Sequence, residues 1–150
     1  MHGCVFTPIR GPAEIEREYH QRFSGMIERW LDAGHGECLL QRCGCAKIVA
    51  EALHYFEGVR VAMISFVVMP NHVHALFVQN PEWILEKLIQ SWKRFTASEI
   101  NRCLERSGSL WQRDYSDRLV RDKNHFANCL RYIRRNAERE RLGEDPVHSI

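Results

Sequence analysis

The sequence predicts an α+β domain in which helices pack on an antiparallel sheet. Two apolar stretches, Val59–Val68 and His72–Gln79, are rich in β-branched residues and predict neighbouring strands. Met69-Pro70-Asn71 between them has the composition of a turn, so the two strands are expected to form a hairpin. Segments with helical apolar spacing precede and follow this hairpin. Helices alternating with a few strands in 150 residues predict a single α+β domain, residues 1–150.

The segment before the hairpin is expected to contain one short strand and two helices. Cys4–Ile9 is weakly strand-like, and Pro8 limits it to a sheet edge because proline lacks the backbone N–H that an inner strand donates. From Ala13 to about Ala33, apolar residues recur at helical spacing and predict a helix that ends at Gly34. Cys45–Phe56 shows the same spacing and predicts a second helix.

Two further helices are expected after the hairpin. Glu82–Arg106 combines apolar residues at helical spacing with several cations. Leu110–Val120 is mixed polar and aromatic, which suits a short strand or an extended loop. Asp122 to about Leu142 predicts the last helix, with a C-terminal tail from about residue 143.

Charge is distributed unevenly along the chain. The net charge is +2, but residues 1–80 carry seven Lys and Arg against eight Asp and Glu, whereas residues 87–135 carry 12 against five. A basic second half favours a polyanionic partner, although a solvated helix face would give the same composition. No apolar run reaches the roughly 18–20 residues of a membrane span, and the N-terminus lacks a signal-peptide pattern. We therefore expect a cytoplasmic protein with reduced cysteines and no membrane partner.

Two histidines at the start of the second predicted hairpin strand form the first candidate site. Residues two apart on a strand point to the same face, so His72 and His74 would present two imidazoles side by side, with Val73 turned to the core. Imidazole is a common ligand of divalent metals. Such a pair is also frequent in purely structural strands, so a metal site and a packing role both remain open.

The last predicted helix carries a second informative pair. Tyr132 and Asn136 are four residues apart and share one helix face, flanked by Arg131, Arg134 and Arg135. The Arg side chains can hold phosphate oxygens, the Asn oxygen can complete a metal site, and the phenol is a candidate nucleophile. Because a phenol is protonated at neutral pH, it needs activation, which a metal that neutralises phosphate charge would assist. Ordinary amphipathic packing would explain the same residues.

Several sequence blocks, in order along the chain, point to one protein family. They are Trp30-Leu31-Asp32-Ala33-Gly34-His35-Gly36-Glu37-Cys38, Val67-Val68-Met69-Pro70-Asn71-His72-Val73-His74, Ser91-Trp92-Lys93-Arg94-Phe95-Thr96-Ala97, Leu110-Trp111-Gln112-Arg113-Asp114-Tyr115, Asp117-Arg118-Leu119-Val120-Arg121-Asp122, and His125-Phe126 with Tyr132-Ile133-x-x-Asn136. The chain resembles the single-tyrosine transposases with a His-hydrophobic-His motif (the IS200-like class), and more narrowly those associated with repetitive extragenic palindromes (REP elements). The resemblance extends from about residue 28 to 142, and its Met-Pro-Asn-His-Val-His block is highly specific.

The resemblance implies a ferredoxin-like antiparallel sheet and a metal-dependent DNA transposase. It implies that His72 and His74 bind Mg²⁺ or Mn²⁺, with Asn136 as the third ligand. Tyr132 would attack a phosphodiester in single-stranded DNA near a hairpin, giving a 5′-phosphotyrosine intermediate and a free 3′-hydroxyl, and a second 3′-hydroxyl would rejoin the strands. The candidate DNA contacts are Lys93, Arg94, Arg113, Arg118, Arg121, Arg131, Arg134 and Arg135, with aromatic residues available for stacking.

Three departures from the family pattern leave room for a domesticated or decaying member. Only Cys4–Arg10 remains to fill the place of the family's longer first strand. Ala137 and a charged stretch follow Asn136, where relatives have a proline and a short apolar tail. Ser116 stands where an aromatic residue is usual. None of these departures removes a candidate catalytic residue.

Three alternatives to an active transposase remain open. A nucleotide hydrolase of the histidine-triad kind needs a third histidine, but Leu76 occupies that alternate position. A domesticated protein that binds DNA hairpins without cutting them, or an inert relic of the fold, would keep the same residues. The resemblance allows a monomer or a homodimer. In a homodimer Tyr132 could serve the partner's histidines and lie far from His72 within one chain.

Overall fold

A five-stranded antiparallel sheet in the order β1-β3-β4-β2-β5 forms the centre of the molecule. The structure is a computed structural model that describes residues 5–6, 26–32, 38–42, 44–112, 116–120 and 122–148. The strands are β1 (Val5–Phe6), β2 (Met26–Asp32), β3 (Val61–Val68), β4 (His72–Gln79) and β5 (Ser116–Leu119).

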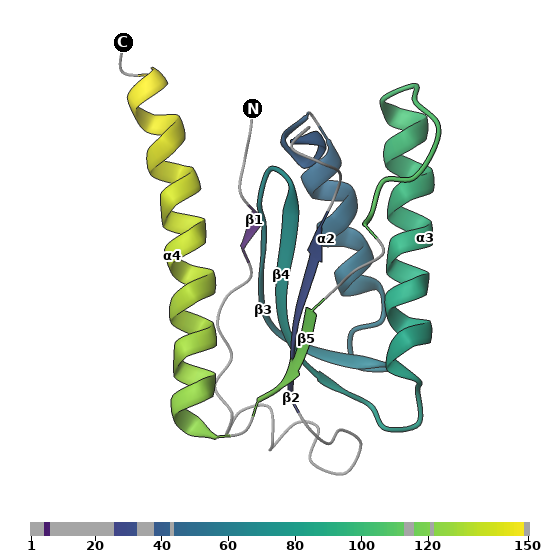
Figure 1. The fold of residues 1–150 in the computed structure, drawn as a ribbon, viewed down its shortest axis with the longest axis vertical. Helices are drawn as coiled ribbons and strands as arrows, with labels where there is room; N and C mark the ends of the chain where they lie inside the picture. The colour runs from purple at the N-terminus through teal and green to yellow at the C-terminus, as the bar shows by residue number, and fades with distance from the viewer. Residues whose placement is uncertain are drawn as a thin grey trace.

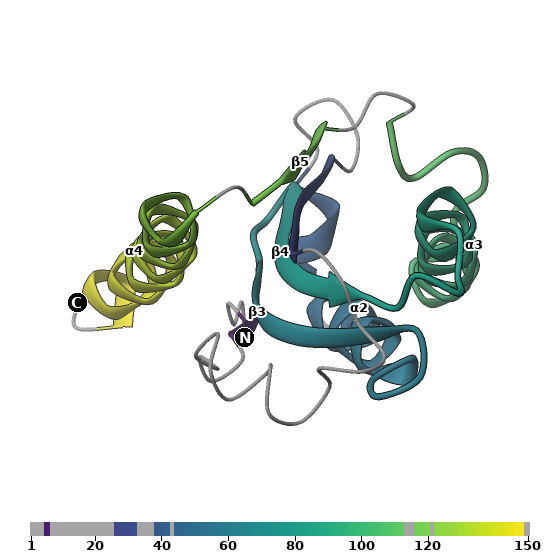
Figure 2. The same ribbon diagram turned by 90° about the horizontal axis from the view of Figure 1, so that it is seen from below.

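Helices cover both faces of this sheet. They are the short 3₁₀ helix η1 (Leu39–Gln41) and the α-helices α2 (Cys45–Tyr55), α3 (Leu85–Cys103) and α4 (Lys123–His148). Helices α2 and α3 lie on one side of the sheet, and α4 lies on the other (Figure 1, Figure 2). None of the helices in the described part of the chain is both long and apolar enough to span a membrane.

The connectivity β2-α2-β3-β4-α3-β5, with sheet order β3-β4-β2-β5, is that of a ferredoxin-like fold. The predicted α+β fold class is therefore confirmed. Helix α4 follows this unit in the chain and brings the segment with Tyr132 and Asn136 to the face that α2 and α3 leave open.

The sheet separates two hydrophobic clusters, and a bulge in β3 keeps both continuous. Met63 and Phe66 belong to the cluster under α2 and α3, whereas Ile64 and Val67 belong to the cluster under α4. The pairing of β3 with β4 shifts by one residue between Met63 and Ser65. Because side chains alternate between faces along a strand, the extra residue reverses the alternation, so that Met63 and Phe66 face the same cluster although they are three residues apart.

The sequence-based prediction of a helix from Ala13 to about Ala33 is wrong for residues 26–32, which form β2. This strand pairs with β4 along its whole length and with β5 over four residues. Its apolar residues Met26, Ile27, Trp30 and Leu31 have helical spacing, but pairing with strands on both sides outweighs this local preference. Residues 13–25 and Ala33 lie outside the described part of the chain.

At the start of the chain, Val5–Phe6 pairs with β3, which confirms the expected edge position. At the other end, α4 continues to His148, so the tail expected from residue 143 is helical.

Candidate functional site

A tight turn fixes the start of the strand that carries the histidines. The Met69 N–H donates to the His72 carbonyl at 2.8 Å, which closes the β3–β4 hairpin over Pro70 and Asn71. From outside the hairpin, the Leu40 N–H donates to the Pro70 carbonyl at 2.9 Å. Helix η1 thus holds the turn from the α2 side, and the position of the first histidine does not depend on the loop alone.

Strand alternation places both histidines on the face covered by α4. Val73 belongs to the cluster under α2 and α3, whereas Leu76 belongs to the cluster under α4. His72 and His74 have the same parity as Leu76 and therefore point to the α4 side, as the sequence predicts. His74 is only 2% exposed, and His72 is half-buried.

The side chain of Asn71 orients His72. Its Oδ1 lies 2.9 Å from His72 Nδ1. With Asn71 Oδ1 as the acceptor, His72 Nδ1 would be the donor, and Nε2 would then be the nitrogen that faces a metal ion. Histidines that bind metals are commonly oriented in this way through their second nitrogen.

Helix α4 is capped at its start and docked through an apolar stripe. The Asp122 side chain accepts a hydrogen bond from the His125 N–H at 2.8 Å, which satisfies one free donor of the first turn. The stripe packs on the β3 and β4 side chains of the second cluster, and it comprises Phe126, Cys129, Ile133 and Ala137, with Leu130 partly buried beside it. The cap and the stripe together set which helix face meets the histidines.

Tyr132 lies directly against His74 of the same chain. The two ring centroids are 4.8 Å apart, with 55° between the ring planes. The Tyr132 side chain remains 39% exposed, so the phenol lies at the boundary between the buried histidine and solvent. A large ligand can therefore approach the phenol from outside while the imidazole stays on the protein side.

Asn136 extends the same helix face by one turn. Helix α4 runs opposite to β4, so the step from Tyr132 to Asn136 leads toward the His72 end of the strand (Figure 1). Four helical residues rise about 6 Å, close to the roughly 6.6 Å between strand residues two apart. The pair Tyr132 and Asn136 therefore matches the spacing of His74 and His72.

The donor set on this face suits a divalent metal. Asn136 is 5% exposed, and its Nδ2 has no hydrogen-bond partner among the described residues. Because amide N and O positions are assigned from their surroundings, rotating the amide by 180° would turn the oxygen toward this vacant partner position. Among the described residues, no group of three or more His, Cys, Asp and Glu could hold a metal. The amide oxygen of Asn136 is a ligand of another type that could complete the set with the two histidines.

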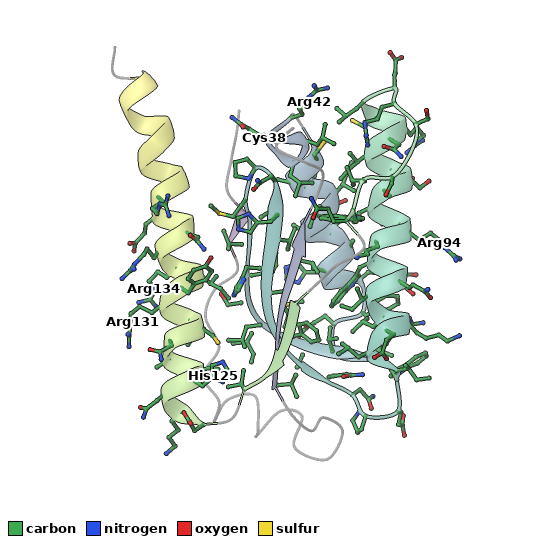
Figure 3. All side chains as sticks on the ribbon, in the orientation of Figure 1. Cys38, Arg42, Arg94, His125, Arg131 and Arg134 are labelled. Carbon is green, nitrogen blue, oxygen red and sulfur yellow. The ribbon has the colours of Figure 1, made fainter. Side chains whose placement is uncertain are left out.

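The described basic residues that are predicted to contact DNA lie on two sides of the molecule. Arg131 and Arg134 project from the outer face of α4, whereas Arg94 projects from α3 on the opposite side of the molecule (Figure 3). Arg135 is exposed on α4. Lys93 is half-buried, and its Nζ donates to the Gln112 carbonyl at 3.0 Å, which ties the segment after α3 to that helix.

Three other predicted DNA contacts have side chains outside the described part of the chain. Arg113 and Arg121 lie outside the described residues. For Arg118 only the backbone is described, and it pairs with Glu28 across β5 and β2.

The sequence of the chain matches the model of a known protein family. The model of the IS200-like transposases matches residues 44–136, which is more than half of the chain and includes both histidines, Tyr132 and Asn136. The chain belongs to the IS200-like transposase family. No curated protein matches the chain.

Two solved structures of transposases share the fold. A REP-associated tyrosine transposase bound to a REP hairpin matches with a TM-score of 0.60 and 14% identity, over 74% of this chain and 65% of that one. A candidate transposase from Deinococcus radiodurans matches with a TM-score of 0.52 and 18% identity, over 74% of this chain and 89% of that one. At these identities the likeness shows a common fold. The match spans slightly less than two thirds of the REP-associated protein.

Two aromatic side chains of the segment predicted as the helix after the hairpin are not buried in the core. Trp83 and Phe95 are both exposed. The polar neighbours of Phe95 on the helix surface, Ser91, Ser98 and Glu99, were the signal that this ring lies outside the buried stripe.

Proposed function

We propose that this IS200-like transposase cuts and rejoins single-stranded DNA next to a hairpin through a phosphotyrosine intermediate. The observation that carries the proposal is the contact between Tyr132 and His74 within one chain, with Asn136 buried one turn further along the same helix face. This arrangement would let a nucleophile, two imidazoles and an amide act at one site beside the exposed edge of Tyr132. The likeness to a transposase bound to a REP hairpin supports hairpin DNA as the partner.

His72, His74 and Asn136 would hold the metal ion. When bound, a divalent cation would neutralise charge on the scissile phosphate and so favour attack by an oxygen nucleophile. Oxygen ligands suit Mg²⁺ and Mn²⁺ alike, but imidazole is a poor ligand for Mg²⁺, so the two histidines favour Mn²⁺. The hydrogen bond from His72 Nδ1 to Asn71 leaves Nε2 as the ligating atom of that ring.

Tyr132 would act as the nucleophile. Its Oη forms a bond to phosphorus as the bond from phosphorus to the 3′-oxygen breaks. The phenol loses its proton, and the departing 3′-oxygen gains one to become a free hydroxyl. The downstream strand stays attached to Tyr132 through its 5′-phosphate. A second 3′-hydroxyl then attacks the same phosphorus and returns the phenol, so bond energy is conserved and no external energy source is needed.

The proposal is tested by trapping the covalent adduct. The protein is incubated with Mn²⁺ and a hairpin-bearing oligonucleotide with a single-stranded flank, then resolved on a denaturing gel. We expect a shifted band that Tyr132→Phe abolishes and that the matched variants Tyr55→Phe and Tyr115→Phe retain. His72→Ala is expected to lose the band while hairpin binding persists.

Two results would contradict the proposal. A band that survives Tyr132→Phe would assign the attack to another residue. Hairpin binding with no band under any metal would show that the protein is a catalytically inactive, domesticated hairpin-binding protein.

A further inference from the structure

An open groove lies between α2 and α3, on the opposite side of the sheet from Tyr132. Its volume is about 1120 Å³, and the end of α2, the first half of α3 and the two loops beside them line it. Because α4 lies on the other side of the sheet, the groove is separate from the histidine site (Figure 2). The cavity is as large as typical ligand-binding clefts.

Exposed aromatic rings border this groove. Tyr55 is 80% exposed and Phe95 is 53% exposed, and Trp83 and Ile84 lie exposed beside them. Water-exposed rings of this size are costly to leave uncovered, and their gathering at one groove marks a binding surface. The exposed apolar residues of the groove are three aromatic rings and one aliphatic side chain. This composition favours a partner with flat rings that can stack, rather than a helix with aliphatic side chains.

The cations of the groove favour a polyanion. Arg60, Lys87 and Arg94 line it, together with two acidic residues, Glu51 and Glu82. The carboxylate of Glu51 lies 3.9 Å from Lys47 Nζ, which offsets its charge. The net charge of the lining is therefore positive, which favours an anionic ligand.

Contacts among the lining residues connect the floor of the groove. The guanidinium carbon of Arg60 lies 3.9 Å from the Phe56 ring centroid and 4.0 Å from that of Trp83, so it is held between two rings. Asn80 joins the two loops, because its Nδ2 donates to the Val59 carbonyl and its N–H donates to the Arg60 carbonyl, both at 2.8 Å. Little ordering is then needed when a ligand stacks on these rings.

We propose that this groove binds unpaired bases of a single-stranded nucleic acid, with Tyr55 and Phe95 as stacking platforms and Lys87 and Arg94 as phosphate contacts. Single-strand binding surfaces combine aromatic platforms with a cationic track in this way. The proposal takes its class of partner from the proposed function. It adds a site on the opposite face, where a strand can be held without entering the histidine site.

The test uses a labelled oligothymidine, which forms no hairpin, and fluorescence anisotropy without metal in the Tyr132→Phe background. Phe95→Leu keeps apolar bulk but removes the ring, so we expect affinity to fall about fivefold or more, whereas Phe95→Tyr retains it. Arg94→Gln is expected to lower the slope of log affinity against log salt by about 0.7. Arg102→Gln, on the same helix but outside the groove and paired with Glu99, is the matched control and keeps the slope.

Equal affinity of the parent and Phe95→Leu for oligothymidine, or no binding at all, would overturn the proposal. The two proposals fail separately: a covalent adduct without oligothymidine binding removes the groove proposal alone. Groove-dependent binding without an adduct removes the proposed catalysis alone.

Discussion

Replacing Ile133 with alanine tests whether α4 is docked as described. Ile133 is fully buried among the β3 and β4 side chains, and it precedes the turn that leads to Asn136. The substitution removes three buried carbon atoms at about 0.8 kcal/mol each, or about 2.4 kcal/mol of transfer free energy. The cavity left between helix and sheet adds to this loss, because a rigid strand cannot collapse into it. We expect the free energy of unfolding to fall by about 3 to 4 kcal/mol.

Urea denaturation followed by circular dichroism measures this change. The midpoint is expected to fall with little change in slope, since the surface exposed on unfolding is nearly the same. Arg134→Ala is the matched control: it alters the next residue, which is exposed, and is expected to change stability by less than about 0.5 kcal/mol. A loss below about 1 kcal/mol for Ile133→Ala would show that α4 does not pack through this stripe. The contact between Tyr132 and His74 would then lose its structural basis.

Three further predictions concern the elements around the site. Asp122→Ala removes the cap that accepts the His125 N–H, and it is expected to lower the free energy of unfolding by about 1 kcal/mol in urea denaturation. Asp122→Asn is expected to keep most of this stability. Equal losses in both variants would refute a capping role. Asn71→Ala removes the hydrogen bond to His72 and is expected to weaken Mn²⁺ binding about 10- to 100-fold in calorimetry. Asn71→Asp is expected to retain the affinity for Mn²⁺. Unchanged affinity in the alanine variant would exclude an orienting role. A mixture of His72→Ala and Tyr132→Phe proteins is expected to form no DNA adduct, because each chain supplies Tyr132 to its own histidines; recovery of the adduct would show exchange of α4 between chains.

The hairpin and the helices were predictable because their patterns are local. The apolar run Val61–Val68, the Pro-Asn turn and the alternation around Val73 define the strands and the face of each histidine. The four-residue spacing of Tyr132 and Asn136 defines their common helix face. What the sequence left open was whether the two faces meet, since that depends on the docking of α4.

Two features were not predictable because neighbours in space decide them. The residues of β2 have helical apolar spacing, and only the pairing of the strand with β4 and β5 shows that it is extended. The exposed rings of Tyr55 and Trp83 line one groove, and their meeting there depends on how α2 packs beside α3. The placement of the cations depends on packing in the same way, since Arg94 on α3 and Arg131 and Arg134 on α4 project to opposite sides of the molecule (Figure 3).

The central claim is that Tyr132 is the nucleophile served by the histidines of its own chain. The most direct measurement is mass spectrometry of the DNA adduct formed with Mn²⁺, after digestion of protein and DNA, to identify the residue that carries the phosphate. We expect a single modified peptide that contains Tyr132, and its disappearance in His74→Ala. Phosphate on a different tyrosine, such as Tyr115, or on Tyr132 with undiminished yield in His74→Ala, would contradict the account.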